Sequence, residues 1–192
     1  MNRPLKGCFG SAVAVLAALS LAGCAAMESA PSSIAANPQV KLDRVEIASY
    51  FPYAPSPARV PLILAFIFNV TNPNDHALTL EELRFAYSFE FQGQFFALNS
   101  PAIYEQQSIP PRTTNQLRVV SVLDSAIVPA TLAVTQGFRM QELDVKPPDL
   151  VKTWWEAIGD FGYAIQVSEG VATFTAGKAS TLVTFQETFR KN

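Results

Sequence analysis

The sequence predicts a mainly β fold, a sandwich or barrel built from short antiparallel strands. Residues 83–91 carry an apolar side chain at every second position, which is the period of a strand with one buried face. Residues 62–68 form a continuous apolar run rich in β-branched and aromatic side chains, which favours a fully buried strand. Glycine, proline and asparagine separate these runs from other short strands, as in all-β domains.

The other strands are expected from the same signals. An alternation over residues 45–49 predicts the first strand, and prolines 52, 55 and 57 then break the chain. Gln92 and Gly93 turn the chain after the alternating strand, so residues 95–98 are expected to return beside it. The remaining predicted strands are residues 117–123, 163–167 with 171–174, and 182–189.

One short amphipathic helix is expected in this β-rich chain. Pro148 and Asp149 are residue types that start helices, and Gly159 is expected to end the helix. Between them, apolar side chains recur at helical spacing. They are Leu150, Val151, Trp154, Trp155 and Ile158.

The N-terminus has the layout of a secretory signal, with two basic residues, an apolar stretch over residues 12–21, and small residues before a cysteine. The stretch is shorter than the roughly 20 residues that span a bilayer. The whole signal-like segment ends in Leu21, Ala22, Gly23 and Cys24. They resemble the lipobox that lipoprotein signal peptidase cleaves, which implies that an acylated Cys24 begins the mature protein.

We therefore expect three parts: a lipoprotein signal peptide (residues 1–23), a flexible tether (24–39) and a β-sandwich domain (40–192). The tether is rich in Ala, Ser and Pro. Ala25 stands where an aspartate would retain an enterobacterial lipoprotein in the inner membrane. The expected location is therefore the periplasmic face of the outer membrane. Cys8 is removed with the signal, so no thiol or disulfide is expected in the domain.

The composition argues against nucleic acid binding, because the net charge is −2 and a nucleic acid site needs a basic footprint. The sequence has no Gly-x-Ser-x-Gly elbow, no His-Glu-x-x-His motif and no phosphate-binding glycine loop. We expect no enzyme, no cofactor and no metal. The expected partners are the membrane, reached through the N-terminal lipid, and a protein or a lipid.

The candidate acid-base residues are interpreted as surface residues. His76, the single histidine, stands beside asparagine and aspartate. Glu81 and Glu82 are neighbours on a predicted strand, so they face opposite sides and cannot act together. Glu156 and Asp160 stand four apart and could share a helix face, but Gly159 is expected to end the helix before Asp160.

Asn72, Pro73 and Asn74 form a turn motif. The Asn72 side-chain oxygen can accept a backbone N–H two residues on, and Pro73 presets φ for a turn. This structural interpretation is favoured. The alternative is a ligand or metal role for Asn72, Asn74 and Asp75, whose oxygens suit Ca²⁺, although the spacing is not that of an EF-hand loop.

With this motif the sequence resembles the WHy domain (water stress and hypersensitive response), also called the type 2 late embryogenesis abundant domain. The resemblance covers roughly residues 40–189 and includes the apolar strand before the turn, the leucine-spaced strand after it, the segment 108–111 and the helix at 148–158. It implies an immunoglobulin- or fibronectin-III-like antiparallel β-sandwich of about seven strands with one short helix. The sequence departs from the family's pattern in two places. The chain around Glu169 and Gly170 is slightly longer than in the family, and the stretch 136–144 is longer and more polar.

Trp154 and Trp155 are the candidate interaction surface. On a helix they point about 100° apart, so both can be buried only if the helix is packed on two sides. One interpretation is that a tryptophan caps the end of the sandwich. The other is a partly exposed tryptophan at a partner or membrane surface.

Three functions remain open. The resemblance implies non-catalytic protection of proteins or membranes during desiccation, cold or osmotic stress. Related domains are thought to hold lipid in a groove, which the Phe-rich strand 83–91 could line here, although packing on the other sheet is the commoner use of such a face. The third is a structural or accessory subunit of an envelope assembly that pairs through exposed strand edges.

Overall fold

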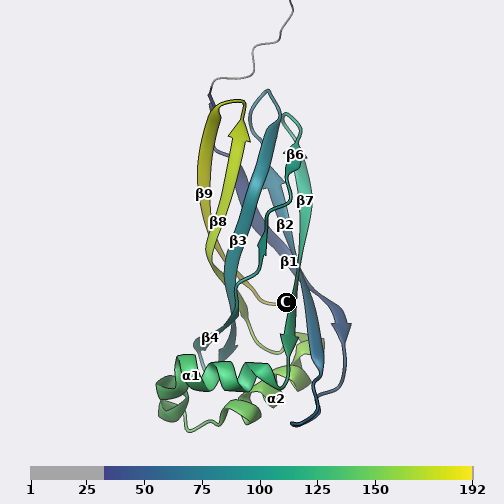
Figure 1. Cartoon of the computed structure of the whole chain (residues 1–192), viewed down its shortest axis with the longest axis vertical. Coiled ribbons are helices and arrows are strands. Elements are labelled where there is room, and N and C mark those ends of the chain that lie inside the picture. The colour runs from purple at the N-terminus through teal and green to yellow at the C-terminus, as the bar shows by residue number, and fades with distance from the viewer. Residues whose placement is uncertain (1–32, 192) are drawn as a thin grey trace, which may run out of the picture.

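The computed structural model of the chain describes residues 33–191. Two antiparallel sheets pack face to face, with helices across one end (Figure 1). One sheet has the order β1-β2-β7, and the other has the order β4-β3-β8-β9 with β5 and β6 also paired to β3. The strands are β1 Gln39–Tyr50, β2 Pro61–Thr71, β3 Leu78–Phe91, β4 Gln94–Asn99, β5 Ala102–Ile103, β6 Gln107–Ile109, β7 Thr114–Asp124, β8 Ile165–Ala176 and β9 Ala179–Phe189.

Aromatic side chains of the two inner faces make the core. Phe66 of β2 contacts Phe85 and Tyr87 of β3, with ring centroids 5.0 and 4.7 Å apart. Phe68 reaches Phe85 and also Phe185 of β9, at 5.0 and 5.4 Å. These spacings suit edge-to-face and offset contacts, which add to the burial of apolar area. The alternating strand and the continuous apolar strand therefore pack on each other.

The predicted mainly β fold is confirmed, and each of the predicted strands is present. Gln92 and Gly93 both have positive φ (49° and 76°), the conformation of the tight hairpin turn expected between β3 and β4. The expectation of about seven strands misses two short ones, β5 and β6. These segments are two and three residues long, too short for any periodicity to reveal.

The expectation of one helix is wrong. The predicted helix is α2, Pro147–Ala157, followed by the 3₁₀ turn η1, Ile158–Asp160. A second helix, α1, runs over Ile127–Glu142 and includes most of the stretch expected to be a polar loop. It has no side-chain N-cap, carries a proline near its start and bends at Gln136. Without a cap or a single apolar stripe, the usual sequence signals of a helix are missing.

Both helical segments end on a non-glycine residue in the left-handed conformation. After α1, Asp144 has φ 48°, and the Val145 N–H donates to the Met140 carbonyl. After η1, Phe161 has φ 49°, and the Gly162 N–H donates to the Ala157 carbonyl. This is the Schellman pattern, normally marked by glycine. The α-helix ends at Ala157, just before Gly159 as expected, but the left-handed residue that closes the helical segment is Phe161 and not Gly159.

The unexpected length around Glu169 and Gly170 is a β-bulge inside β8. The β8–β9 register shifts between Val167 and Gly170, and Glu169 has φ 52°. A Cβ on residue 170 would lie 2.5 Å from the Phe185 ring and carbonyl oxygen, so only glycine fits there. The extra residue is absorbed without breaking the strand.

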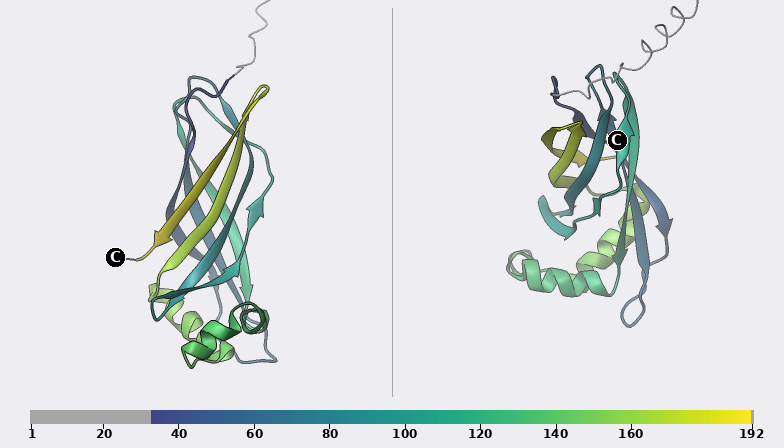
Figure 2. Two further views of the ribbon diagram at one scale, coloured as in Figure 1. Left: turned by 90° about the vertical axis from the view of Figure 1, so that its left-hand side faces the viewer. Right: turned by 45° about the horizontal axis from the view of Figure 1, so that its top comes forward.

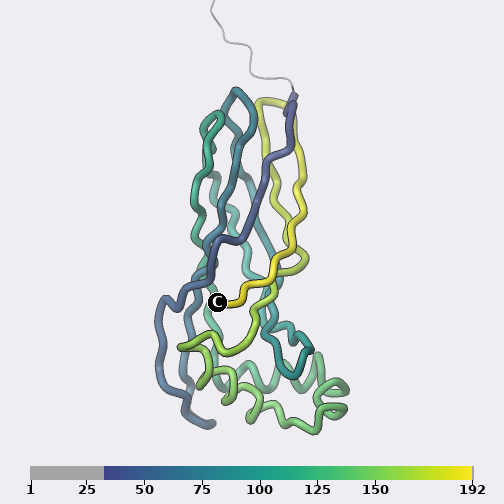
Figure 3. The backbone as a smooth tube through the Cα atoms, turned by 180° about the vertical axis from the view of Figure 1, so that it is seen from behind, coloured from purple at the N-terminus to yellow at the C-terminus, as the bar shows by residue number. Residues whose placement is uncertain are grey.

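The chain enters the domain at one end of its long axis, and the helices lie at the other (Figures 1 and 2). The first strand, β1, and the last, β9, lie side by side near the end where the chain enters and diverge towards the middle of the domain (Figure 3). Among residues 33–191, no helix is both long and apolar enough to cross a membrane.

Candidate functional site

The Asn72–Pro73–Asn74 turn joins β2 to β3 at the end where the chain enters. The Asn72 side-chain oxygen accepts the Asn74 N–H at 2.9 Å, which confirms the expected turn. Its amide nitrogen donates to the carbonyls of His76, Ile109 and Pro110 at 2.8, 3.1 and 3.1 Å. Asn72 is almost completely buried. One side chain therefore ties the β2–β3 turn to the segment that leads into β7.

Asn74 holds the N-terminal segment. Its side-chain oxygen accepts the Ala36 N–H at 2.9 Å, and its side-chain nitrogen donates to the Ala36 carbonyl at 2.8 Å. The amide thus occupies both backbone groups of one residue, as a neighbouring strand would. Ile34 packs against the core and Pro38 is buried. Residues 34–38 of the expected tether therefore lie on the domain.

The oxygens proposed as alternative ligands are engaged by protein groups. Both asparagine oxygens accept backbone N–H groups, and Asp75 is bonded to His76, with Oδ1 and Nδ1 3.0 Å apart. This hydrogen bond is the main reason that the pKa of Asp75 lies below its ordinary value. Among the described residues, no group of three His, Cys, Asp or Glu side chains is placed to hold a metal.

His76 is less exposed than the sequence suggests. Its side chain is 21% exposed, and its Nε2 atom is buried with no hydrogen-bond partner among the described residues. Its carbonyl accepts the Asn72 amide. The residue therefore belongs to the turn, and its ring is half-buried against it.

The tryptophans lie at the opposite end, as in the interpretation that a tryptophan caps the sandwich, and the alternative of an exposed tryptophan is wrong. Trp154 and Trp155 are each 1% exposed. The Trp154 indole N–H donates to the Glu90 carbonyl at 2.9 Å, and its ring contacts Phe89 and Phe96. Both are buried because the sheets lie on one side of α2 and α1 packs on another. These residues close the end of the core and cannot themselves contact a partner.

A buried polar cluster near this end has no clear signal in the sequence. The hydroxyl of Ser121 on β7 lies 3.0 Å from the Tyr87 hydroxyl and accepts the Asn99 amide at 3.0 Å. Burial raises the pKa of Tyr87, so the phenol stays neutral. Ser121 lies among valines and leucines on the strand, and its partners come from β3 and β4. The cluster links the two sheets.

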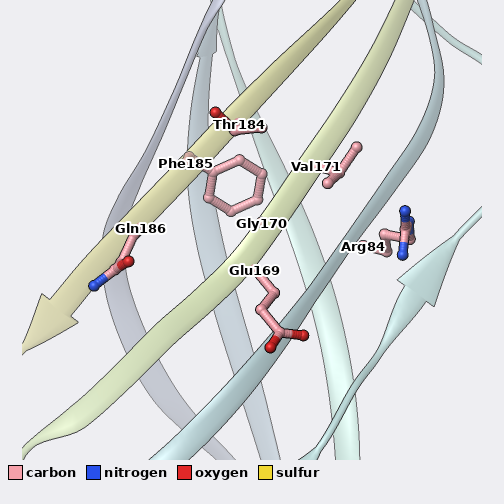
Figure 4. A pocket seen from close by; sticks show the side chains of 7 residues that line it. All are labelled: Arg84, Glu169, Gly170, Val171, Thr184, Phe185 and Gln186. Carbon is pink, nitrogen blue, oxygen red and sulfur yellow. The ribbon is translucent and has the colours of Figure 1, made fainter.

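A shallow hollow of about 460 Å³ lies at the β8 bulge (Figure 4). Arg84 and Glu169 are its charged side chains, and Gly170 forms its floor beside Phe185. It contains no second carboxylate and no nucleophile with a base, which is what acid-base or covalent catalysis would need.

The other candidate carboxylates have separate partners. Glu81 accepts the Thr175 hydroxyl at 2.7 Å, while Glu82 pairs with Arg84 at 3.2 Å. Glu156 lies 3.8 Å from Lys152 on the surface of α2. Glu81 and Glu82 have no shared partner, but the expectation that they face opposite sides is wrong. The β3–β8 register shifts between Leu80 and Glu82, so both glutamates lie between the buried Leu80 and Leu83 and are partly exposed. The lipobox residues Leu21, Ala22, Gly23 and Cys24 lie outside the described residues.

No family model matches the chain, and no curated protein matches it. Two solved structures are similar over most of their length. The Northeast Structural Genomics Consortium target SoR45 is 13% identical with a TM-score of 0.44, over 80% of this chain and 86% of that one. A protein from Archaeoglobus fulgidus is 12% identical with a TM-score of 0.38, over 78% and 94%. Likenesses this distant carry no assignment of fold or function.

Proposed function

We propose that the chain is a lipid-anchored, non-catalytic module of the bacterial cell envelope, attached through Cys24 to the periplasmic face of the outer membrane. The observation that supports this best is the exit of the chain. The Asn74 amide fixes Ala36 at one end of the domain. Residues 24–32 extend by at most about 30 Å, so an anchored chain would keep that end near the lipid and direct the helical end away.

The anchor is tested by labelling growing cells with a fatty acid that carries a chemical handle. The unaltered chain should take up the label and sediment with membranes. Cys24→Ser should lose both, whereas Cys8→Ser should keep both because Cys8 lies in the segment that is cleaved off. Equal labelling of the Cys24→Ser chain would rule out the proposed anchor.

We propose further that the domain is a WHy-type sandwich of the immunoglobulin or fibronectin III kind. Its two antiparallel sheets, the Asn-Pro-Asn turn between β2 and β3, and a helix ahead of β8 support this relationship. The resemblance then favours protection of proteins or membranes under drying or osmotic stress.

The outer face of β9 suits such protection. Ser180, Leu182, Thr184, Gln186 and Thr188 are exposed on this face, so four of its five side chains carry a hydroxyl or an amide and none is charged. Such groups donate and accept hydrogen bonds, and can therefore replace water at the surface of a drying protein or lipid headgroup.

A labile enzyme dried with the purified protein should recover more activity than with an equal mass of albumin. The variant Thr184→Val with Thr188→Val keeps the shape of β9 and removes two hydroxyls, so it should protect less. Recovery no better than with albumin would exclude this protective function. It would not bear on the proposed lipid anchor at Cys24.

Lipid binding inside the sandwich is the weaker alternative. Phe85, Tyr87 and Phe89 of β3 are at most 2% exposed, and their rings contact other core aromatics. The face that could line a groove is thus filled by packing. An accessory role in an envelope assembly is the third alternative, and the exposed apolar side chains Val134 and Phe138 of α1 support it.

A further inference from the structure

Three turns of the domain meet beside the N-terminal segment at the end where the chain enters (Figure 1). Asn74 holds Ala36 through two hydrogen bonds, and its own carbonyl accepts the Arg112 N–H at 3.0 Å. At the start of β9, the Thr181 hydroxyl donates to the Asn37 side-chain oxygen at 3.4 Å. We call the surface formed by the turn residues 72–77, 110–113 and 177–178 the entry surface.

The turns of the entry surface are held by contacts with one another. The Asn72 N–H donates to the Thr113 carbonyl at 2.9 Å, and the Asn72 side-chain amide donates to the Pro110 carbonyl at 3.1 Å. The Thr113 hydroxyl donates to the same Pro110 carbonyl at 2.9 Å. Prolines at 73, 110 and 111 restrict the backbone further. Side chains on these turns are therefore presented from a fixed base.

The entry surface carries two exposed basic side chains, Arg112 and Lys178. Neither belongs to an ion pair among the described residues. The arginines that do pair with carboxylates are Arg44, Arg59, Arg84 and Arg190. The one acidic residue of the entry surface, Asp75, is bonded to the His76 ring. Both cations are therefore available to an anion outside the chain.

The helical end of the domain has the opposite charge. Between Ile127 and Asp160 the chain has five acidic and three basic residues, all of them exposed, so the net charge of this stretch is −2. The acidic residues are Glu142, Asp144, Asp149, Glu156 and Asp160, and the basic ones are Arg139, Lys146 and Lys152. An anionic surface therefore attracts the entry end of the domain and repels the helical end.

We propose that the entry surface binds anionic phospholipid headgroups, with Arg112 and Lys178 on the lipid phosphates. This inference rests on the proposed anchor at Cys24. Residues 24–32 extend by about 30 Å at most, so an anchored chain keeps the entry surface close to the membrane. The lipid phosphates are the anions that this position brings to the two cations, and the acidic helical end then points away from the membrane.

The contact depends on the tether for its strength. Each basic residue beside an anionic membrane favours binding by roughly fivefold, so Arg112 and Lys178 together contribute about thirtyfold. This is too little to recruit a free protein from dilute solution. A short tether raises the effective concentration of the membrane surface, so the contact is populated in the anchored chain.

The test uses the acylated full chain in vesicles, with one added cysteine that carries a dye whose emission rises when it leaves water. Ala77→Cys places the dye on the entry surface, and Thr153→Cys places it on α2 at the helical end; both positions are exposed. In vesicles that contain phosphatidylglycerol, the emission from Ala77→Cys should be at least twofold that in vesicles of phosphatidylcholine alone. The emission from Thr153→Cys should be the same in both.

Two charge variants of the Ala77→Cys chain identify the residues that make the contact. Arg112→Gln with Lys178→Gln should lower the ratio of bound to unbound domains about thirtyfold, which returns the emission to its value in phosphatidylcholine. Lys146→Gln with Lys152→Gln is the matched control, because it removes two exposed charges at the helical end, and it should change nothing. Salt at about 1 M, which shortens the Debye length to roughly 3 Å, should release the unaltered entry surface.

Flotation of the vesicles in the same high salt scores the anchor separately, because salt does not weaken an acyl anchor. A chain that does not float would overturn the anchor and with it the headgroup contact. A chain that floats but gives equal Ala77→Cys emission in both kinds of vesicle would overturn the contact alone. Emission that persists in the Arg112→Gln, Lys178→Gln chain would do the same.

Discussion

At the end where the chain enters, Asn72 and Asn74 bond to backbone groups of four other residues. At the opposite end, Trp154 and Trp155 are held by aromatic and apolar packing, with a single indole hydrogen bond. The first end depends on a few directional contacts, and the second on the shape and volume of many side chains. This difference predicts how each end responds to substitution.

Removing an aromatic side chain from the helical end should have the largest effect. Trp154→Ala should lower the free energy of unfolding by about 3–5 kcal/mol, because it empties a large buried volume and leaves the Glu90 carbonyl unpaired. Chemical denaturation measures the change. In the matched pair, Trp154→Phe should cost more than Trp155→Phe, since the Trp155 N–H has no partner among the described residues. Equal costs would contradict the assigned hydrogen bond.

Asn72→Ala should come next, at about 2–3 kcal/mol. It removes one small side chain, but the buried Asn74 N–H and the Ile109 carbonyl lose its hydrogen bonds. Asn69→Ala is the control, because the Asn69 side chain bonds only the exposed Asp43 side chain among the described residues. A loss for Asn72→Ala no greater than for the control would show that this end also depends on packing.

Asn74→Ala should act locally. We expect a loss of about 1 kcal/mol and faster hydrogen exchange at the Ala36 amide, because the N-terminal segment loses both bonds that hold it. Exchange in the β3 core should not change. If the Ala36 amide stays equally protected, Ile34 and Pro38 hold the segment without the asparagine.

Phe138→Ser should change the free energy of unfolding by less than about 0.5 kcal/mol. The ring is almost fully exposed, so folding gains little from it. Thermal unfolding of the dilute protein measures this. A loss of stability similar to that of Trp154→Ala would mean that Phe138 packs within its own chain.

The smallest effect concerns the Asp75 carboxyl. His76→Ala should raise the pKa of Asp75 towards its ordinary value, as followed by carboxyl chemical shifts in an NMR titration. Because the pKa of Asp75 is lower in the folded than in the unfolded chain, its carboxylate stabilises the fold at pH values above the unfolded pKa. This contribution is lost as the pH falls through the lower, folded pKa. Asp124, whose pKa is lowered chiefly by Arg59, should not change. If the pKa of Asp75 does not change, the backbone hydrogen bond, and not His76, lowers it.

The sequence predicted the long strands because their signals are local. The alternation in β3 and the apolar run of β2 report which face is buried, and burial sets the period. The turn at Asn72 was predictable for a similar reason, since an asparagine oxygen reaches an N–H only two residues away. The start of α2 was visible from its prolines and Asp149.

The rest was decided by contacts between distant parts of the chain. Helix α1 is held by Gln136 and Arg139 on the edge of β4, some forty positions earlier, and no local pattern announces those bonds. Trp154 and Trp155 are both buried because α1 packs on α2, so their exposure could not be judged before α1 was known. The role of Asn74 depends on Ala36, which only the folded chain brings to it.

The sequence by itself determined a mainly β chain with a turn at Asn72, a helix before the last two strands, and a lipobox-like segment ending at Cys24. Only the tertiary structure decided that the N-terminal segment and the helices lie at opposite ends of the domain. Local periodicity reports burial but not direction, because direction depends on which strands pair and where the helices pack. That arrangement places the N-terminal segment at one end and the helices α1 and α2 at the other.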